Sequence, residues 1–187
     1  MFKKNPNNDK AGDTEDTLNA LREGSAQAFH LLYKKYNQKI YRFCLRMLCD
    51  ADLARDAFQE TFIKVFEHRS EFRGSNFSAW IFTIARHTCL NFIRSRKEYE
   101  SVEDDMHFST KEMDSDIAMK DCVNKAIAIL PVALREALLL REYEELTYQE
   151  IAEVLGIDLS LAKIRVFRAR EILRKLLTPL KQELYES

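Results

Sequence analysis

The sequence predicts an all-α protein with two small helical domains, the second a helix-turn-helix, joined by a flexible acidic linker. Only 4 glycines and 3 prolines occur among the 187 residues, whereas most sheets need more turn residues than that. Apolar residues recur at helical spacing in two long blocks. Between the blocks lies an acidic tract without this spacing, which we interpret as a linker.

The linker position divides the chain into five parts. We expect a disordered amino terminus at 1–15, a first helical domain at 16–97, the acidic linker at 98–116, a helix-turn-helix domain at 117–180 and a tail at 181–187. The chain lacks an apolar run of the ~20 residues that a bilayer span needs. Since no signal peptide is recognised either, we expect a cytoplasmic protein without membrane insertion.

Three helices are predicted in the first domain. Ser25 is the expected N-cap of the first helix, whose apolar residues are Ala28, Leu31, Leu32, Tyr36, Ile40, Phe43, Leu45 and Leu48. The second runs from about Asp52 to Phe66, with an inner face of Leu53, Ala57, Phe58, Phe62, Val65 and Phe66. A loop containing Gly74 leads to a third helix, which starts near Phe77.

The second domain contains the clearest local signals. It begins near Ile117, and Pro131 occupies the first turn of a helix. Thr147 and Glu150 form a capping-box pattern, and the apolar run that follows ends at Gly156, an expected C-cap. A capped helix followed by a short glycine-containing turn is typical of the helix-turn-helix.

The last helix is the strongest candidate for a DNA-reading element. We expect Ser160 to cap it and its end to lie near Leu177, with a buried stripe of Leu161, Val166, Ala169, Leu173 and Leu176. Six basic residues and one acidic residue lie in 163–175, although the net charge of the whole chain is only −1. An exposed basic helix reads base edges in the major groove. The alternative is a solvated amphipathic helix, which the adjacent capped helix makes less favourable.

Two further surfaces stay ambiguous from spacing alone. Residues 72–97 combine aromatic and basic side chains, as single-stranded nucleic-acid binders do, although core packing is the better interpretation of Trp80, Phe82 and Phe92 individually. Carboxylates at Asp52, Asp56 and Glu60 share one helix face beside Gln59. Such a face can dock on a basic protein surface, but a merely solvated face is favoured from spacing.

Metal and cofactor chemistry finds no support in the pattern. The four cysteines form no C-x-x-C pair and are expected to be reduced thiols. No cluster of histidines and acidic residues completes a site around the carboxylates, and no nucleophile motif occurs. We therefore expect no cofactor, no metal and no enzymatic activity.

Three segments together resemble the sigma-70 superfamily, specifically the extracytoplasmic-function (ECF) group. The segment D-A-F-Q-E-T-F-I-K-V-F (56–66) is similar to the one that engages the clamp coiled coil of RNA polymerase. The segment F-R-G-S-N-F-S-A-W-I-F-T-I-A-R (72–86) resembles the promoter-melting segment. The segments L-T-Y-Q-E-I-A-E-V-L-G-I (146–157) and K-I-R-V-F-R-A-R (163–170) resemble the −35-reading helix-turn-helix. The resemblance covers residues 17–177, and the order of the segments makes it specific.

The resemblance implies a role for each matching position. The core-docking positions are Asp56, Gln59 and Glu60, which replaces the solvated-face interpretation. The −10 positions are Arg73, Ser75, Asn76 and Phe77 in the base-capturing loop, followed by Trp80, Arg86, His87, Asn91 and Arg94. The −35 positions are Ser160, Lys163, Ile164, Arg165, Phe167 and Arg168.

Six positions depart from the family pattern. His87 stands where Asn is usual and Asn91 where Asp is frequent. The segment 160–162 reads Ser-Leu-Ala in place of Gly-Thr-Val, and Ile164 replaces a common Ser. Base contacts therefore need not follow the usual pattern of the family.

The implied partners are core RNA polymerase, at its clamp coiled coil and flap tip, promoter DNA in duplex and single-stranded form, and an anti-sigma factor. The implied function is promoter-specific initiation of transcription. The first alternative is a stand-alone helix-turn-helix regulator, which needs neither a melting segment nor a core-docking face. The second is a helical metal-dependent enzyme that acts on nucleotides.

Overall fold

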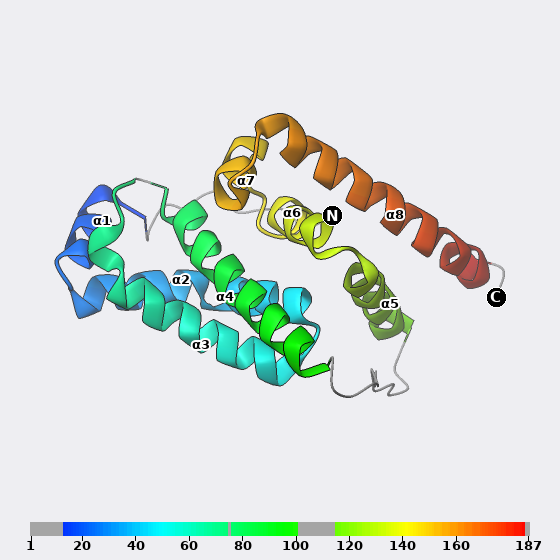
Figure 1. Ribbon diagram of the computed structural model, residues 1–187, viewed down its shortest axis with the longest axis horizontal. Coiled ribbons are helices and arrows are strands. Elements are labelled where there is room, and N and C mark those ends of the chain that lie inside the picture. Colours follow the sequence, from blue (N-terminus) through cyan, green and yellow to red (C-terminus); the bar gives the residue numbers. More distant parts are fainter. Residues whose placement is uncertain (1–12, 75, 101–114, 186–187) are drawn as a thin grey trace.

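A computed structural model of the protein describes residues 13–74, 76–100 and 115–185. All regular secondary structure within these residues is helical, which confirms the predicted all-α class (Figure 1). The elements are α1 (Glu15–Arg22), α2 (Ala26–Leu48), α3 (Ala51–Glu67), the short 3-10 helix η1 (Arg69–Glu71), α4 (Phe77–Glu100), α5 (Ser115–Ile129), α6 (Val132–Glu142), α7 (Tyr148–Leu155) and α8 (Leu159–Tyr185).

The first group of helices packs around α2. Helices α3 and α4 lie against α2 and against each other, and α1 closes one end (Figure 1). Ser25 caps α2 as predicted, since its hydroxyl accepts from the Ala28 amide at 3.3 Å. The fully buried core is mostly aromatic and aliphatic, with Tyr36, Phe43 and Phe82 as its largest members, and such side chains dominate the energetics of burial.

The second group is built around the contact between α7 and α8. Thr147 and Glu150 form the predicted capping box of α7: the Thr147 hydroxyl accepts from the Glu150 amide, and the Glu150 carboxylate accepts from the Thr147 amide. Gly156 ends α7 with φ of +63°, a left-handed conformation that glycine adopts without strain. Local sequence signals thus fix the turn between the two helices.

Several local predictions were wrong by one residue or one face. Helix α8 begins at Leu159, so Ser160 lies in its first turn and does not cap it, and Pro131 is the N-cap of α6 and not its first residue. The buried residue in the first turns of α8 is Ala162, whereas Leu161 is exposed. Phe66, which was assigned to an inner face, is also exposed, as is Leu31 of the first apolar series. Helix α8 extends beyond Leu177 to Tyr185.

Most of the expected disordered terminus and most of the expected linker lie outside the described residues. Residues 1–12 of the expected disordered terminus and 101–114 of the acidic linker are among those not described. Asp13 is described, and its carboxylate accepts hydrogen bonds from Lys35 Nζ at 2.9 Å and the Tyr36 hydroxyl at 2.6 Å. No described helix is long and apolar enough to cross a membrane.

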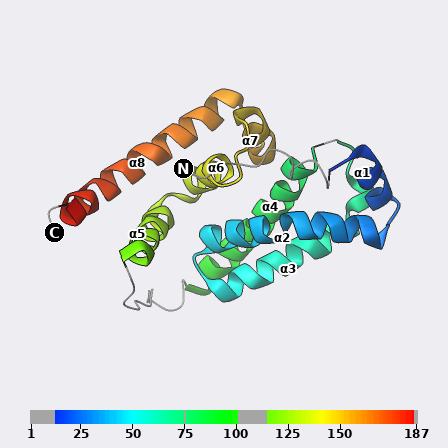
Figure 2. The same cartoon turned by 180° about the vertical axis from the view of Figure 1, so that it is seen from behind.

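The two helical groups lie against each other. Helix α4 contacts α7, and α2 contacts α5 and α6. The view from behind shows α2 and α4 on one side and α5 to α8 on the other (Figure 2). This packing brings the predicted DNA-reading segments of the two groups close together.

Candidate polymerase and promoter interfaces

The predicted core-docking residues lie on the outer face of α3. Asp56 and Gln59 are exposed, and Glu60 is half-buried with its carboxylate 2.5 Å from Lys64 Nζ. Asp52, earlier on the same helix, pairs with Arg55 at 2.9 Å. The carboxylate face is therefore open to a partner.

An apolar groove between α2 and α3 adjoins this face and was not predicted. It has a volume of ≈ 690 Å³ and is lined by Ala26, Phe29, Tyr33, Phe58, Gln59, Phe62, Ile63, Phe66 and Glu67. Ile63 is 56% exposed and Phe66 is 42% exposed, although aliphatic and aromatic side chains are usually buried. Contiguous exposed apolar surface with a polar rim marks a protein-binding site. The helical period placed Phe66 on the inner face because a period alone cannot separate a core from a docking groove.

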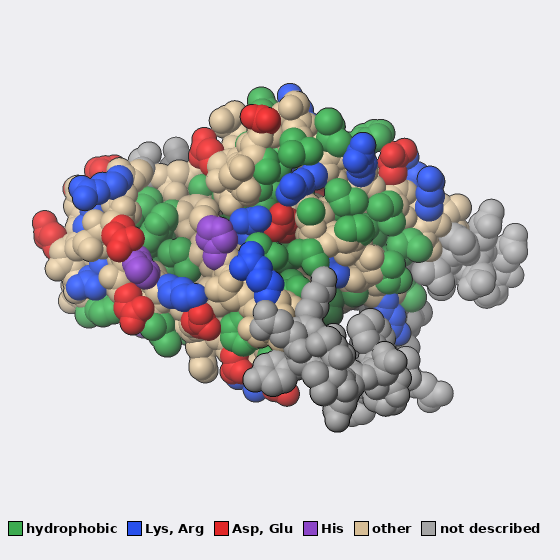
Figure 3. Space-filling model, in the orientation of Figure 1, with side chains coloured by type: hydrophobic (Ala, Val, Ile, Leu, Met, Phe, Trp, Pro, Cys, Tyr) green, Lys and Arg blue, Asp and Glu red, His purple; other side chains and the backbone are tan. Residues whose placement is uncertain are grey.

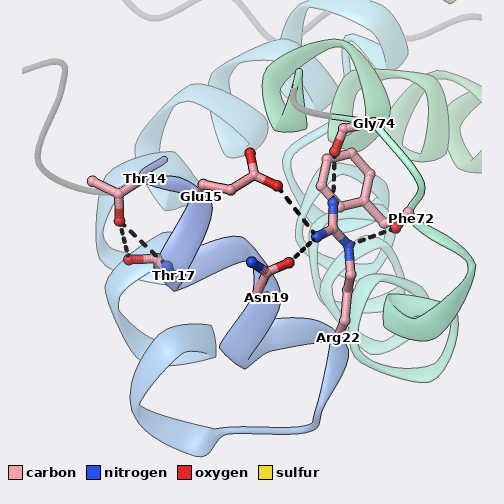
Figure 4. A network of polar contacts seen from close by, with 7 residues as sticks. All are labelled: Thr14, Glu15, Thr17, Asn19, Arg22, Phe72 and Gly74. Carbon is pink, nitrogen blue, oxygen red and sulfur yellow. Dashed lines mark hydrogen bonds and ion pairs between the residues drawn. The ribbon is translucent and has the colours of Figure 1, made fainter.

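The loop before α4 is held by Arg22, a residue that the sequence interpretation missed. Arg22 donates from Nε to the Phe72 carbonyl and from Nη2 to the Gly74 carbonyl, both at 2.8 Å, and Asn19 and Glu15 contact the same guanidinium (Figure 4). Its guanidinium also lies 5.0 Å from the Phe72 ring centroid. Contacts across 50 and 52 residues give no periodic signal, which is why sequence reasoning missed them.

The predicted base-capturing loop divides into exposed and buried members. Arg73 is exposed, whereas Phe77 is buried under Tyr36 and Trp80, with ring centroids 5.3 Å and 5.6 Å away. In the described arrangement, the buried Phe77 ring packs against Phe72 of the loop and so supports it from the core side. Ser75 lies outside the described residues. Asn76 Oδ1 accepts from the Ala79 amide at 3.0 Å, which caps α4.

The remaining −10 positions follow one side of α4. His87, Asn91 and Arg94 are exposed at a spacing that places them on one face, and Arg94 donates to Asn91 at 3.4 Å. Partial burial, followed by the charges of Arg86 and Arg94, lowers the pKa of His87, so its imidazole is neutral near pH 7. Trp80 is half-buried against the core. This face offers hydrogen-bonding groups and one cation to a nucleic acid.

The predicted recognition surface lies on the exposed face of α8. Lys163 and Arg168 are exposed beside two apolar side chains, Ile164 at 44% and Phe167 at 61%. Ser160 is exposed in the first turn. Basic side chains contact guanine edges or phosphates, and apolar ones contact thymine methyl groups. The exposed face of α8 therefore carries both kinds of major-groove contact.

Three predicted DNA-contacting residues have carboxylate partners within the chain. Arg86 Nε donates to Glu136 Oε2 at 2.7 Å, and Arg165 Nη1 donates to Glu136 Oε1 at 3.2 Å. Glu136 is only 2% exposed, so it carries its charge inside the protein between α4, α6 and α8. Asn76 Nδ2 donates to Glu150 Oε1 at 2.8 Å, across the same junction. Lys and Arg side chains gather over α4 and the facing helices in Figure 3.

The described residues contain no group of three or more His, Cys, Asp or Glu that could hold a metal ion. The four cysteines are free thiols, and Cys44 and Cys89 are buried. A hydrogen bond with Cys44, together with burial, raises the pKa of Cys89. These thiols behave as small apolar core residues.

Comparison with known proteins matches the two helical groups to two separate family regions. Residues 32–99 match Sigma-70 region 2, and residues 120–173 match Sigma-70 region 4. The RNA polymerase sigma-H factor of Pseudomonas aeruginosa is 34% identical over 185 residues, which cover 90% of this chain and 96% of that protein. The ECF RNA polymerase sigma-E factor of Escherichia coli is 30% identical over 86% of this chain and 92% of its own length.

Solved structures give the same answer for the fold. The sigma factor RpoE of Bartonella quintana, in complex with the anti-sigma factor NepR, superposes with a TM-score of 0.71 at 27% identity, over 81% of this chain and 98% of that one. CnrH, in complex with the cytosolic domain of CnrY, shares the fold with a TM-score of 0.70 at 19% identity, over 88% of this chain and 97% of that one. Since both regions match in order and the relatives align over nearly the whole chain, this protein belongs to the sigma-70 family of RNA polymerase sigma factors, in the ECF group.

Proposed function

We propose that this chain is a promoter-specific initiation factor whose two helical groups divide the work of reading a promoter. The α2–α3 surface binds core RNA polymerase, α4 with its preceding loop captures melted −10 DNA, and α8 reads the −35 duplex. The polymerase performs the chemistry, since sigma factors are not a class of enzymes. The stand-alone regulator is not favoured, because the chain contains region 2 as well as region 4.

One observation carries the proposal. Exposed apolar residues occur at two sites, with negative charges beside them at one site and positive charges beside them at the other. Ile63 and Phe66 lie near carboxylates on α3, whereas Ile164 and Phe167 lie among cations on α8. The first combination suits a protein surface and the second suits a DNA groove. A factor that joins polymerase to a promoter needs both.

Promoter binding on this proposal requires the two groups to separate. Arg86 and Arg165 share Glu136, and Asn76 is bonded to Glu150. These three side chains must exchange a carboxylate for nucleic acid before they can contribute to reading. Each group alone binds DNA weakly, and docking on polymerase makes the second contact effectively intramolecular.

An anti-sigma factor is the remaining partner on this proposal. The solved relative RpoE is in complex with the anti-sigma factor NepR, and a protein that holds the two helical groups together would keep their DNA-reading residues covered. No residue of this chain is assigned to that contact.

Transcription in vitro tests the proposal. Core polymerase, sheared genomic DNA of the source organism and this protein are combined, and new RNA 5′ ends are mapped. Discrete starts that depend on the protein and share two upstream elements at constant spacing are expected. The variant Gln59→Ala/Glu60→Ala should lose these starts while keeping its affinity for −35 duplex DNA. If protein-dependent starts are absent with a matched core polymerase, the proposal is wrong.

A further inference from the structure

Helix α2 carries an unusual excess of positive charge. The chain as a whole has 29 basic and 30 acidic residues, so the two signs nearly balance. The 23 residues of α2 contain no acidic residue. They contain five Lys and Arg residues, namely Lys34, Lys35, Lys39, Arg42 and Arg46. No function described above uses these residues.

The cations lie on the side of α2 that faces away from the apolar groove between α2 and α3, which we call the docking groove. Lys35, Lys39, Arg42 and Arg46 recur at helical spacing, whereas the groove takes Phe29 and other residues from the opposite side. The basic residues line a cavity of ≈ 230 Å³ together with Gln38, Tyr143 and Glu144. We call this surface the α2 basic face.

Most of these cations are not neutralised within the described part of the chain. Lys35 pairs with Asp13 at 2.9 Å, but Lys34, Lys39, Arg42 and Arg46 have no described acidic group within ion-pair distance. Arg46 stacks on the Tyr143 ring with its guanidinium carbon 3.9 Å from the centroid. By contrast, Arg22, Arg55, Lys64 and Arg86 in the same helical group all have carboxylate partners.

Glu144, the acidic residue that lines the same cavity, leaves the positive charge largely uncompensated. Burial raises the pKa of Glu144 to about 7 even though Lys39, Arg46 and Arg42 act to lower it, so near neutral pH it is only partly ionised. Its Oε2 is buried without a hydrogen-bond partner. An anion with more charge and more acceptor oxygens would satisfy these cations better.

The basic face begins beside the −10 segment. Tyr36 follows Lys35 in sequence, and its ring packs 5.3 Å from that of Phe77, the first residue of α4. From Lys35 to Arg46 the helix advances by ~16 Å, at ~1.5 Å per residue. A nucleic-acid strand rises ~3.4 Å per phosphate in B-form geometry. The face therefore matches about five consecutive phosphates next to the place where −10 bases are captured.

We propose that the α2 basic face binds the phosphate backbone of promoter DNA adjoining the −10 element, an inference that rests on the proposed function. The part of the cavity that α2 contributes is lined by Lys, Arg and Gln side chains and by no aromatic one, so it suits phosphates and offers no platform for a base. In the described arrangement, Glu144 and Tyr143 from the α6–α7 connection cover one end of the face. When the two helical groups separate, Glu144 and Tyr143 move away from the α2 basic face, and its cations can then contact DNA.

The test compares holoenzymes assembled with wild type and with Lys39→Gln/Arg42→Gln. Affinity for a fork-junction promoter fragment is measured over a series of salt concentrations, and affinity for core polymerase is measured separately. The fragment lacks the −35 duplex, so the control Arg174→Gln/Lys175→Gln removes the same charge from exposed positions of α8 that have no DNA to contact in this assay. A second variant, Lys39→Arg/Arg42→Lys, keeps the charge and checks that the face tolerates substitution.

The neutral variant should bind the fragment about 10-fold more weakly at ~0.15 M salt, with core affinity unchanged. The slope of log K against log salt should fall by about 1.4 to 1.8, because each lost phosphate contact removes about 0.7 to 0.9. The control and the charge-keeping variant should match wild type. Equal slopes for the neutral variant and wild type would overturn the inference. A loss of core affinity instead would also overturn it, since the face would then bind a protein.

The two proposals fail in different ways. If the wild-type holoenzyme initiates at discrete promoters but the neutral variant binds them equally well, only the inference is wrong. If the wild type shows no promoter-specific binding with core polymerase, the proposed function is wrong and the inference falls with it.

Discussion

The docking groove of α2 and α3 and the recognition surface of α8 expose the same kinds of apolar side chain in opposite electrostatic settings. Phe66 lies on a helix that carries the carboxylates of Asp56 and Glu60, whereas Phe167 lies between Lys163 and Arg168. An exposed phenylalanine alone does not identify its partner. The neighbouring charge does, because a phosphate backbone excludes the acidic surface and attracts the basic one.

The largest expected effect comes from the contact that joins the two helical groups. Glu136→Gln leaves Arg86 and Arg165 without their shared buried carboxylate, and breaking a buried ion pair costs about 3 to 5 kcal/mol. The free energy of unfolding, measured with urea, should fall by an amount of that order. Intramolecular distance measurements by fluorescence energy transfer should show the two helical groups further apart. An unchanged distance would mean that Glu136 does not hold the groups together.

The docking groove should behave as a protein-binding hot spot. Phe66→Ala removes a large apolar contact, and truncation of such an anchor costs about 2 to 4 kcal/mol. Affinity for core polymerase, measured by titration, should fall by that amount. Leu31→Ala is the matched control, because Leu31 is also exposed and lies outside the groove lining. If Phe66→Ala and Leu31→Ala lost the same affinity for core polymerase, the groove would not be a specific binding site.

A substitution on the α8 surface should lower the affinity for DNA and leave the affinity for core polymerase unchanged. Phe167→Ala removes an aromatic side chain of α8 that is 61% exposed, and a base contact is worth about 1 to 3 kcal/mol. Affinity for −35 duplex, measured by fluorescence anisotropy, should decrease, with discrimination reduced at the contacted base pair. A uniform loss over all sequences would instead indicate a phosphate contact.

The smallest effect, counted per pH unit, concerns Glu144. Its pKa is raised from 4.5 to about 7 in the folded chain, so the folded state binds a proton more tightly than the unfolded state does. Its contribution to stability is therefore fully present below pH about 4.5 and is lost as the pH rises to about 7. Glu144→Gln mimics the protonated form and should gain about 1 kcal/mol relative to wild type per pH unit over this window. Urea unfolding at pH 5, 6, 7 and 8 checks this, and a difference that does not change with pH would contradict it.

Local signals predicted the elements of this fold well. Ser25, Thr147 and Gly156 act as caps where the sequence placed them, because a cap depends on residues three or four positions away. The exposed face of α8 follows from the same short-range period. The misplacement of Leu161 and Ala162 is an error of one residue within that period.

What the sequence did not predict depends on distant residues. Arg22 holds a loop 50 residues away, and Arg86 meets Glu136 across another 50. Such pairs have no periodic signature. The docking groove was missed for a related reason, since Phe66 has the helical spacing of a core residue and only the packing of α2 against α3 leaves it exposed.

One measurement tests the contrast between the two surfaces most directly. Wild type, Phe66→Ala and Phe167→Ala are each titrated against core polymerase and, separately, against −35 duplex DNA. The account expects a crossed result, in which Phe66→Ala loses only polymerase affinity and Phe167→Ala loses only DNA affinity. If either variant loses both affinities equally, or the losses are exchanged, the assignment of the apolar groove between α2 and α3 to polymerase and of the basic helix α8 to the promoter is wrong.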